Sequence, residues 1–315
     1  MRIVFMGTPD FSVPTLESLA ASSHEVVAVV TQPDKPKGRG KEIQMTPVKE
    51  AALAHHIPVY QPLRAREDSF VEEMRALKPD VMVVIAFGQI LSRELLEVPK
   101  YGCVNIHASL LPKYRGAAPI QWAVINGDKE TGITTMMMDV EMDTGDMLEK
   151  TVVKLDAEET GGSLFDRLSL LGGDLILSTL EKLENGTMKP EPQNHAEATY
   201  VKKISKSMGD IDWTRDAVSI ERLVRGLNPW PSAFTRLNGK MLKIWKAQVI
   251  QQDFQAEKKD CGRILKAEKD CFEVQTGDGS LKILELQLEG KKRMDAAAFL
   301  RGFPVEAGMV LERSE

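Results

Sequence analysis

The strongest constraint on the fold is a strand–helix alternation in the first half of the chain. Apolar runs rich in β-branched residues alternate with segments of helical periodicity, which predicts an α/β fold with a mostly parallel, doubly wound sheet. Such a sheet binds its ligand at the carboxyl ends of its strands. The predicted strands are Ile3–Met6, Val26–Thr31, Val81–Ala86, Cys103–His107 and Ile133–Met138, and the predicted helices are Pro14–Ala21, Pro47–His55, Ser69–Leu77 and Ala118–Ile125.

The pattern changes in the second half. A helical stripe over Leu164–Leu183 closes the first domain, and the polar, Pro-containing stretch after it is typical of a semi-extended linker. Beyond the linker, tight-turn sequences at Leu237–Lys240 and Thr276–Ser280 are flanked by β-prone runs, and one helix is marked over Ala217–Arg225. The chain is therefore predicted to hold a catalytic domain, a linker and a small OB-like β-barrel, over residues 1–188, 189–207 and 208–315.

Composition and charge limit the possible functions. With 43% hydrophobic and 28% charged residues, the chain has the composition of a soluble globular protein. The apolar run Val81–Phe87 is far too short to span a membrane, and the N-terminus lacks a signal-peptide pattern, so we expect a cytoplasmic protein. Residues 1–199 hold 20 Lys and Arg against 29 Asp and Glu, a net charge of −9, whereas residues 200–315 hold 21 against 17, a net charge of +4. This asymmetry suggests that the C-terminal part handles a polyanion.

The sequence lacks the common cofactor motifs. Gly7-Thr8-Pro9-Asp10-Phe11 follows the first strand where a dinucleotide site would show Gly-x-Gly-x-x-Gly, and no Gly-x-x-x-x-Gly-Lys string occurs. NAD and ATP are therefore disfavoured. Cys103, Cys261 and Cys271 contain no Cys-x-x-Cys pair, and the five histidines show no ligand spacing, so we expect reduced thiols and no bound metal.

The segment Cys103–Gly116 is the richest in chemical groups. On a strand, the side chains of Asn105 and His107 point to the same face. An amide can hold a developing oxyanion and an imidazole can donate or accept a proton, so the pair suits transfer of an acyl-type group. A lone histidine is more often structural, but Asn105 and the polar run Lys113–Gly116 favour a functional role here.

A second cluster places four carboxylates in a short loop between Met138 and Met147. Its spacing lacks the Asp-x-Asp-x-Asp-Gly order of an EF-hand, so a calcium site is disfavoured. One of these carboxylates is free to orient His107 and to stabilise its charged form. The four residues are Asp139, Glu141, Asp143 and Asp146.

In their order and spacing, several short strings resemble the folate-dependent formyltransferases. These strings are Gly7-Thr8-Pro9, Phe87-Gly88-Gln89, Asn105 to Pro112 and Asp143-Thr144-Gly145-Asp146. In the tail, Ile211-Asp212-Trp213 and Asn228-Pro229-Trp230-Pro231 resemble the C-terminal domain of those members that act on methionyl-tRNA, so the resemblance covers nearly the whole chain. The resemblance implies a Rossmann-like catalytic domain, with Asn105, His107 and Asp143 as catalytic residues and folate contacts at Phe87, Gly88, Ser109, Leu110, Leu111 and Pro112.

The resemblance also implies the substrates. The donor would be 10-formyltetrahydrofolate, and the acceptor would be the α-amine of methionine on initiator methionyl-tRNA, formylated for translation initiation. A basic, Gly-containing loop is more often a solvated turn, but in these family members a similar loop enters the acceptor stem. The resemblance therefore predicts tRNA contacts at Lys35, Lys37, Arg39 and Lys41, and we expect the enzyme to be a monomer.

Two other interpretations stay open. The same chemistry could act on a small amine, such as a nucleotide sugar or glycinamide ribonucleotide, which would need no basic tail, although some sugar formyltransferases carry a tail. A non-catalytic RNA-binding protein on a degenerate enzyme fold would have no need of Asn105, His107 and Asp143 together. An assay of formylation on charged initiator tRNA separates the three interpretations.

Overall fold

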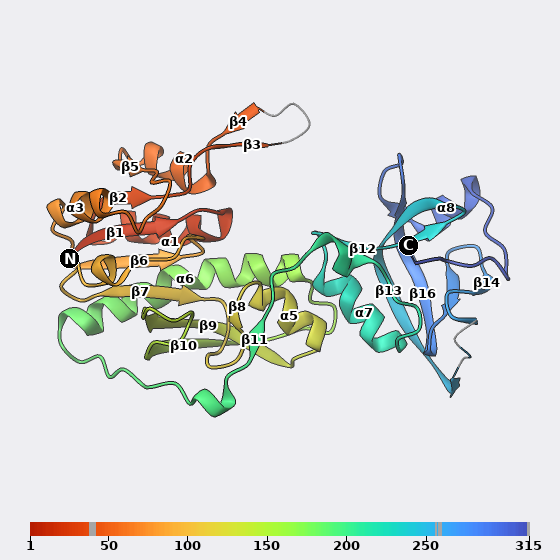
Figure 1. The fold of residues 1–315 in the computed structure, drawn as a ribbon. Helices are drawn as coiled ribbons and strands as arrows, with labels where there is room; N and C mark the ends of the chain where they lie inside the picture. Colours follow the sequence, from red (N-terminus) through yellow and green to blue (C-terminus); the bar gives the residue numbers. More distant parts are fainter. Residues whose placement is uncertain (38–41, 256, 258–259, 314–315) are drawn as a thin grey trace. The chain divides into compact units, whose positions relative to one another are not determined.

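The computed structural model describes residues 1–37, 42–255, 257 and 260–313, and the chain divides into two compact units (Figure 1). The division does not follow one cut along the chain. The first unit comprises Met1–Pro119, Glu130–Lys154 and Phe165–Val201. The second unit comprises Ile120–Lys129, Leu155–Leu164 and Lys202–Glu315.

Within the described residues, the first unit contains a seven-stranded sheet in the order β10-β9-β7-β6-β1-β2-β5. The predicted mostly parallel sheet is confirmed, because the five strands from β7 to β5 in this order run parallel. They are β1 (Arg2–Gly7), β2 (Glu25–Val30), β5 (Val59–Tyr60), β6 (Val81–Ile85) and β7 (Cys103–His107).

The other edge of this sheet is antiparallel. The strand β9 (Glu130–Met137) pairs antiparallel with β7, and β10 (Met147–Lys154) pairs antiparallel with β9. The sequence pattern did not predict β10, because this edge strand shows no apolar alternation: Val152 is exposed, whereas the polar Glu149 and Thr151 lie on the more covered face.

Helices connect the strands and cover the sheet. Helix α6 lies close against α1, because Gly172 and Gly173 present no side chain there: a Cβ on Gly172 would lie 2.6 Å from Oγ1 of Thr15. The rings of Phe11 and Phe165 add an aromatic contact with centroids 5.0 Å apart. The helical segments up to residue 184 are η1 (Asp10–Ser12), α1 (Val13–Ala20), α2 (Pro47–Ala54), α3 (Asp68–Ala76), α4 (Arg93–Leu96), α5 (Pro119–Asn126) and α6 (Gly161–Glu184).

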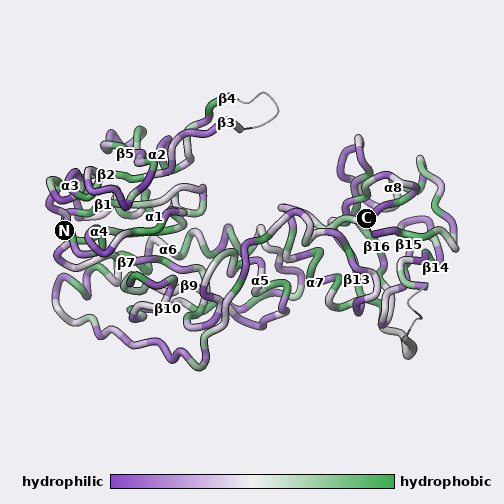
Figure 2. Tube along the Cα trace, viewed as in Figure 1, coloured by the Kyte–Doolittle hydropathy of each residue, from purple (hydrophilic) through white to green (hydrophobic). Residues whose placement is uncertain are grey.

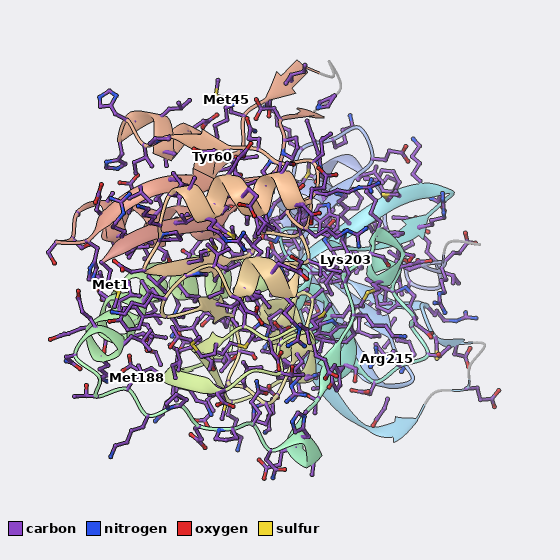
Figure 3. The ribbon with its side chains drawn as sticks, turned by 60° about the vertical axis from the view of Figure 1, so that its left-hand side comes forward. Met1, Met45, Tyr60, Met188, Lys203 and Arg215 are labelled. Atoms are coloured by element: carbon purple, nitrogen blue, oxygen red, sulfur yellow. The ribbon has the colours of Figure 1, made fainter. Side chains whose placement is uncertain are left out.

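A short hairpin follows β2 and projects from the first unit (Figure 1). It consists of β3 (Lys35–Lys37) and β4 (Glu42–Gln44), paired antiparallel, with Lys35 opposite Gln44. Met45, which is labelled in Figure 3, follows β4 and is 48% exposed. The sequence predicted a loop here, and the structure instead pairs the two ends of that loop as strands.

The polar stretch after α6 stays with the first unit as far as Val201. Figure 2 shows that hydrophilic residues predominate along it. Met147 and Glu191 exchange two backbone hydrogen bonds of 2.8 Å. After the 3₁₀ turn η2 (His195–Glu197), β11 (Tyr200–Val201) pairs in parallel with β8 (Arg115–Gly116). This stretch is therefore part of the packed unit.

The second unit is built on an antiparallel sheet, which confirms the predicted β-rich C-terminal domain. A two-residue turn with positive φ at Asn238 (50°) and Gly239 (74°) joins its first two strands, as the Asn-Gly signal predicts. Along the sheet the strands are β12 (Ala233–Leu237), β13 (Lys240–Gln255), β16 (Asp278–Leu288), β15 (Phe272–Gln275) and β14 (Ile264–Ala267), with β17 (Met294–Asp295) paired to β16.

The end of the chain joins the two edges of this sheet. The backbone N–H of Ile264 donates to the carbonyl of Met309, and the N–H of Arg236 donates to the carbonyl of Glu312. Segment 309–312 therefore lies between β14 and β12, as expected for a small barrel. The helical segments after residue 201 are η3 (Lys206–Gly209), α7 (Ala217–Gly226) and the unpredicted α8 (Ala296–Gly302). No helix among the described residues of the whole chain is long and apolar enough to cross a membrane.

Candidate active site

The sheet of the first unit has a topological switch point between β1 and β6, where doubly wound sheets bind their ligands. Three loops meet there. Oγ1 of Thr8 and Nε2 of Gln32 both donate hydrogen bonds to the carbonyl oxygen of Phe87, at 2.9 and 3.2 Å. The carboxyl ends of β1, β2 and β6 are thereby tied together beside β7, which carries Asn105 and His107.

The structure brings His107 and Asp143 together. Nδ1 of His107 lies 3.7 Å from Oδ1 of Asp143, and both side chains are largely buried, at 7% and 14% exposure. On the other side of the ring, Nε2 lies 2.9 Å from the carbonyl oxygen of Tyr114. Since a carbonyl only accepts, Nε2 carries a hydrogen and donates it. Both ring nitrogens therefore lie near oxygen atoms that can accept a hydrogen bond, and this arrangement suits an imidazole that acts as a hydrogen-bond donor.

Asn105 lies two residues before His107 on β7 and is partly buried. Its backbone registers with Val84 on β6 and Met136 on β9. Among the residues that the structure describes, no protein group forms a hydrogen bond with its side-chain amide, so this amide can meet a substrate.

Asp143 is held by backbone geometry that the sequence did not predict. The N–H of Gly116 donates to its Oδ2 at 2.8 Å. Asp143 itself adopts φ = 55°, a left-handed conformation that aspartate tolerates better than most residues. Gly145 follows at a point of close approach, where any Cβ would overlap the carbonyl oxygen of Met137. The carboxylate therefore has a defined position beside His107.

The six residues with predicted folate contacts fall into two groups. Phe87, Ser109 and Leu111 are buried: Oγ of Ser109 donates to the carbonyl of Lys113 at 2.7 Å, and the N–H of Leu111 donates to Oγ1 of Thr134 at 3.2 Å. These three residues shape the loops. The accessible members are Gly88, which is exposed with φ = 82°, and the partly exposed Leu110 and Pro112.

The predicted tRNA contacts are placed only in part. Lys35 and Lys37 lie on β3, where the side chain of Lys35 is exposed, whereas Arg39 and Lys41 lie outside the described residues. The sequence did not indicate how this hairpin is anchored. Nζ of Lys49 donates to Asp34 at 2.5 Å and to Gln61 at 2.8 Å.

Gln61 completes the anchor of the hairpin. Its Nε2 donates to the carbonyl of Gln32 at 3.0 Å and to Oδ1 of Asp34 at 2.7 Å. The hydrogen bonds from Lys49 and then from Gln61 lower the pKa of the Asp34 carboxyl below its ordinary value. The ionised carboxylate of Asp34 therefore holds the base of the hairpin through its hydrogen bonds with Lys49 and Gln61.

The sequence also provided no indication that two further residues, Arg115 and Gln193, take part in the structure of the site. Arg115 belongs to the polar run that the sequence singled out, but nothing in that run signals that its guanidinium is fully buried. Gln193 lies in the stretch predicted as a linker, and its side chain donates to the carbonyls of Asp143 and Gly145, at 2.8 Å each. No local pattern could have connected residues so distant in sequence.

One group of metal-ligating side chains occurs in the described part of the chain. Glu268, Asp270 and Cys271, between β14 and β15, bring three ligand atoms within 4.8 Å of one another. Sγ of Cys271 donates to Glu268 at 3.5 Å, and burial followed by this hydrogen bond raises the pKa of the thiol. A protonated thiol is a poor ligand. The expectation of no bound metal stays a prediction.

Comparison with known proteins identifies the family. The model of the family described as "Formyl transferase" matches residues 1–180, and that of "Formyl transferase, C-terminal domain" matches residues 203–304. The methionyl-tRNA formyltransferase of Agathobacter rectalis is 58% identical over 98% of this chain and 98% of its own length. The protein of the same name from Lachnospira eligens is 56% identical, over 99% of this chain and 99% of its own length. The one from Clostridioides difficile is 50% identical, over 99% of this chain and 100% of its own length.

Solved structures share the fold at lower identity. An N-formyltransferase from Helicobacter canadensis, solved with folinic acid and dTDP-3-aminofucose, has a TM-score of 0.67 at 19% identity and covers 93% of this chain and 99% of that one. A methionyl-tRNA formyltransferase from Clostridium thermocellum has a TM-score of 0.55 at 20% identity, and it covers 79% of this chain and 94% of its own chain. At these identities the structures establish the fold alone. The sequence relatives and both family models show more: this chain belongs to the formyltransferase family, within the group of the methionyl-tRNA formyltransferases.

Proposed function

We propose that this protein transfers the formyl group of 10-formyltetrahydrofolate to the α-amine of methionine on initiator methionyl-tRNA. The product, N-formylmethionyl-tRNA, serves translation initiation. The observation that carries this function is the His107–Asp143 pair beside Asn105 at the end of β7, in a chain 58% identical over nearly its full length to a methionyl-tRNA formyltransferase.

The proposed chemistry uses three side chains. The amine nitrogen attacks the formyl carbon, and the formyl oxygen becomes negatively charged in a tetrahedral intermediate. The Asn105 amide donates a hydrogen bond to this oxygen, and the Nδ1–H of His107 donates a second one, because Nε2–H is already donated to the carbonyl of Tyr114. Asp143 orients His107 and accepts the amine proton, directly or through a water, and the proton ends on the folate nitrogen when its bond to the formyl carbon breaks.

The accessible folate residues suggest how the donor is held. Gly88 comes from the loop after β6, and Leu110 and Pro112 come from the loop after β7. We propose that these three residues contact the folate ring system, since apolar surface and open backbone suit a flat heterocycle. Phe87, Ser109 and Leu111 act instead through the shape of the two loops.

The tRNA is proposed to bind in two places. The β3–β4 hairpin projects from the first unit with Lys35 exposed, and it would place the acceptor end near His107 through Lys35, Lys37, Arg39 and Lys41. The excess of positive charge after residue 199 supports a second contact, in which the antiparallel unit binds phosphates. We propose further that the enzyme acts in the cytoplasm as a monomer and holds no metal.

The test is a transfer assay with purified protein and 10-formyltetrahydrofolate. We expect formylation of methionyl-tRNA and no formylation of uncharged tRNA or free methionine. A dTDP-linked amino sugar is the acceptor that tests the small-amine alternative. Formylation of that sugar with none of methionyl-tRNA would overturn the proposal, and loss of transfer to both acceptors would favour a non-catalytic protein.

A further inference from the structure

Gln193 has every hydrogen-bonding position of its amide engaged inside the first unit. The side chain is buried, at 5% exposure. Its Nε2 donates to the carbonyl oxygens of Asp143 and Gly145, both at 2.8 Å. Its Oε1 accepts from Nε and Nη2 of Arg115, at 3.0 and 2.8 Å. One amide therefore joins the carboxylate loop to a buried arginine.

Arg115 is an unusual partner because its guanidinium is fully buried and its hydrogen bonds go to an amide, a hydroxyl and an imidazole. Nη1 lies 3.0 Å from the hydroxyl of Tyr200 and 3.3 Å from Nδ1 of His195. No carboxylate lies within ion-pair distance of this guanidinium among residues 1–37, 42–255, 257 and 260–313. A buried charge without a counter-ion needs its hydrogen bonds, so Arg115 holds the stretch 193–200 in place.

The same stretch also reaches the other member of the catalytic pair. The N–H of Arg115 donates to the carbonyl of Thr199, and the N–H of Tyr114 donates to Oγ1 of Thr199, both at 2.8 Å. Tyr114 presents the carbonyl oxygen that accepts from His107. Residues 193–199 thus support both the loop that carries Asp143 and the carbonyl that orients His107.

We infer that Gln193 is a positioning residue for Asp143, an inference that rests on the catalytic role proposed for Asp143. The left-handed backbone of Asp143 is one that non-glycine residues rarely adopt, so outside contacts must hold it. The two bonds from Gln193 hold the backbone, and the N–H of Gly116 holds the carboxylate, which sets the 3.7 Å approach to His107. The stretch predicted as a linker therefore contributes to the active site.

The test separates the hydrogen bonds accepted by the amide oxygen of Gln193 from those donated by its amide nitrogen. Gln193→Glu keeps oxygen acceptors for Arg115 and supplies a carboxylate to it, but it removes the N–H donors to Asp143 and Gly145. Gln193→Met removes both sets of hydrogen bonds. Asn185→Asp is the matched control, since it makes the same amide-to-carboxylate change on an exposed residue outside the stretch 193–199, and its Oδ1 can still accept from Thr187.

We expect Gln193→Glu to lower kcat for methionyl-tRNA formylation about tenfold or more, with KM for either substrate changed less than about threefold. Its unfolding temperature should fall less than that of Gln193→Met, because the carboxylate still accepts from Arg115 although it faces two buried carbonyl oxygens. The pH dependence of kcat should shift as well, because the carboxylate that faces His107 is displaced. Gln193→Met should lose both activity and stability, and Asn185→Asp should match the wild type. Wild-type kcat and an unshifted pH profile in Gln193→Glu would overturn the inference.

A double-variant cycle with Asp143→Asn, measured with enzyme in excess, completes the test. If Gln193 acts through Asp143, Gln193→Glu should have little further effect in the Asp143→Asn background. Multiplicative effects of the two substitutions would instead assign Gln193 a merely structural role. If Asp143→Asn alone kept full activity, the proposed mechanism would fail at Asp143, a result distinct from failure at Gln193.

Discussion

The backbone N–H of Gly116 donates a 2.8 Å hydrogen bond to Oδ2 of Asp143. Only glycine fits at this position. Gly116 has φ = 101°, and a Cβ there would lie 2.6 Å from the carbonyl oxygen of Val201 on β11. The pairing of β8 with β11 and the position of the carboxylate therefore depend on the same residue.

Gly116→Ala should consequently lower both stability and activity. Backbone strain of this kind costs on the order of 1–3 kcal/mol, and the displaced N–H would no longer hold Asp143. Thermal unfolding and kcat measure the two effects. Gly186→Ala is the control, because Gly186 also has positive φ (72°) but nothing lies within 4 Å of its added Cβ. Equal effects of the two substitutions would contradict the assigned role.

Asn105→Ala and His107→Ala should each lower the rate of formyl transfer roughly 100-fold or more, the usual scale for removing an oxyanion donor or an acid–base group. The unfolding temperature should change little for Asn105→Ala, because no described protein group bonds to its amide. Single-turnover kinetics at saturating substrates provide the measurement. Near-normal turnover in either variant would show that its assignment is wrong.

Substitutions in the basic hairpin should affect the tRNA and leave the folate untouched. Arg39→Ala is expected to lower transfer to methionyl-tRNA at subsaturating tRNA, with folate binding unchanged. Lys41→Ala should show a smaller defect, because lysine is a point charge without the planar fork of arginine. Deletion of residues 208–315 should weaken tRNA binding and flatten its salt dependence. A silent Arg39→Ala would favour the small-amine acceptor.

The hairpin anchor should loosen at low pH. Hydrogen bonds from Lys49 and then Gln61 lower the pKa of Asp34 in the folded state. A lowered folded pKa means that this anchoring is fully present above the ordinary carboxyl range of about 4 and is lost as the pH falls through the lowered value. Hydrogen exchange of residues 32–37 and 42–46, corrected for the intrinsic pH dependence, should therefore rise at acid pH. Asp34→Asn should abolish this dependence, and unchanged dependence in that variant would refute the anchor.

Removal of divalent metals should leave formyl transfer intact. None of the residues placed in the proposed mechanism is a member of the group formed by Glu268, Asp270 and Cys271. Exhaustive chelation in a buffer that keeps tRNA folded with monovalent salt is the measurement, and the treated protein should retain its rate. Activity lost on chelation and restored by zinc alone would require a metal in the mechanism.

Four of the five parallel strands and the residues on β7 follow from the sequence, whereas the two-residue strand β5 was not predicted. The run Val81–Ile85 predicts its own strand, because buried parallel strands are continuous apolar segments and this property is local. Alternation along a strand then places Asn105 and His107 on one face without knowledge of the rest of the chain. The Asn238-Gly239 turn is local in the same way, since only residues that tolerate positive φ can form it.

Only the tertiary structure decided what surrounds those residues. Gln193 lies 78 positions from Arg115 in the sequence, and no periodicity connects a polar stretch with a buried guanidinium at that separation. The antiparallel edge strand β10, the left-handed backbone of Asp143 and the burial of Phe87, Ser109 and Leu111 likewise depend on long-range contacts. Residue types and local spacing determine which chemical groups are present, whereas the packing of distant segments determines which of them are held, covered or left open to a substrate.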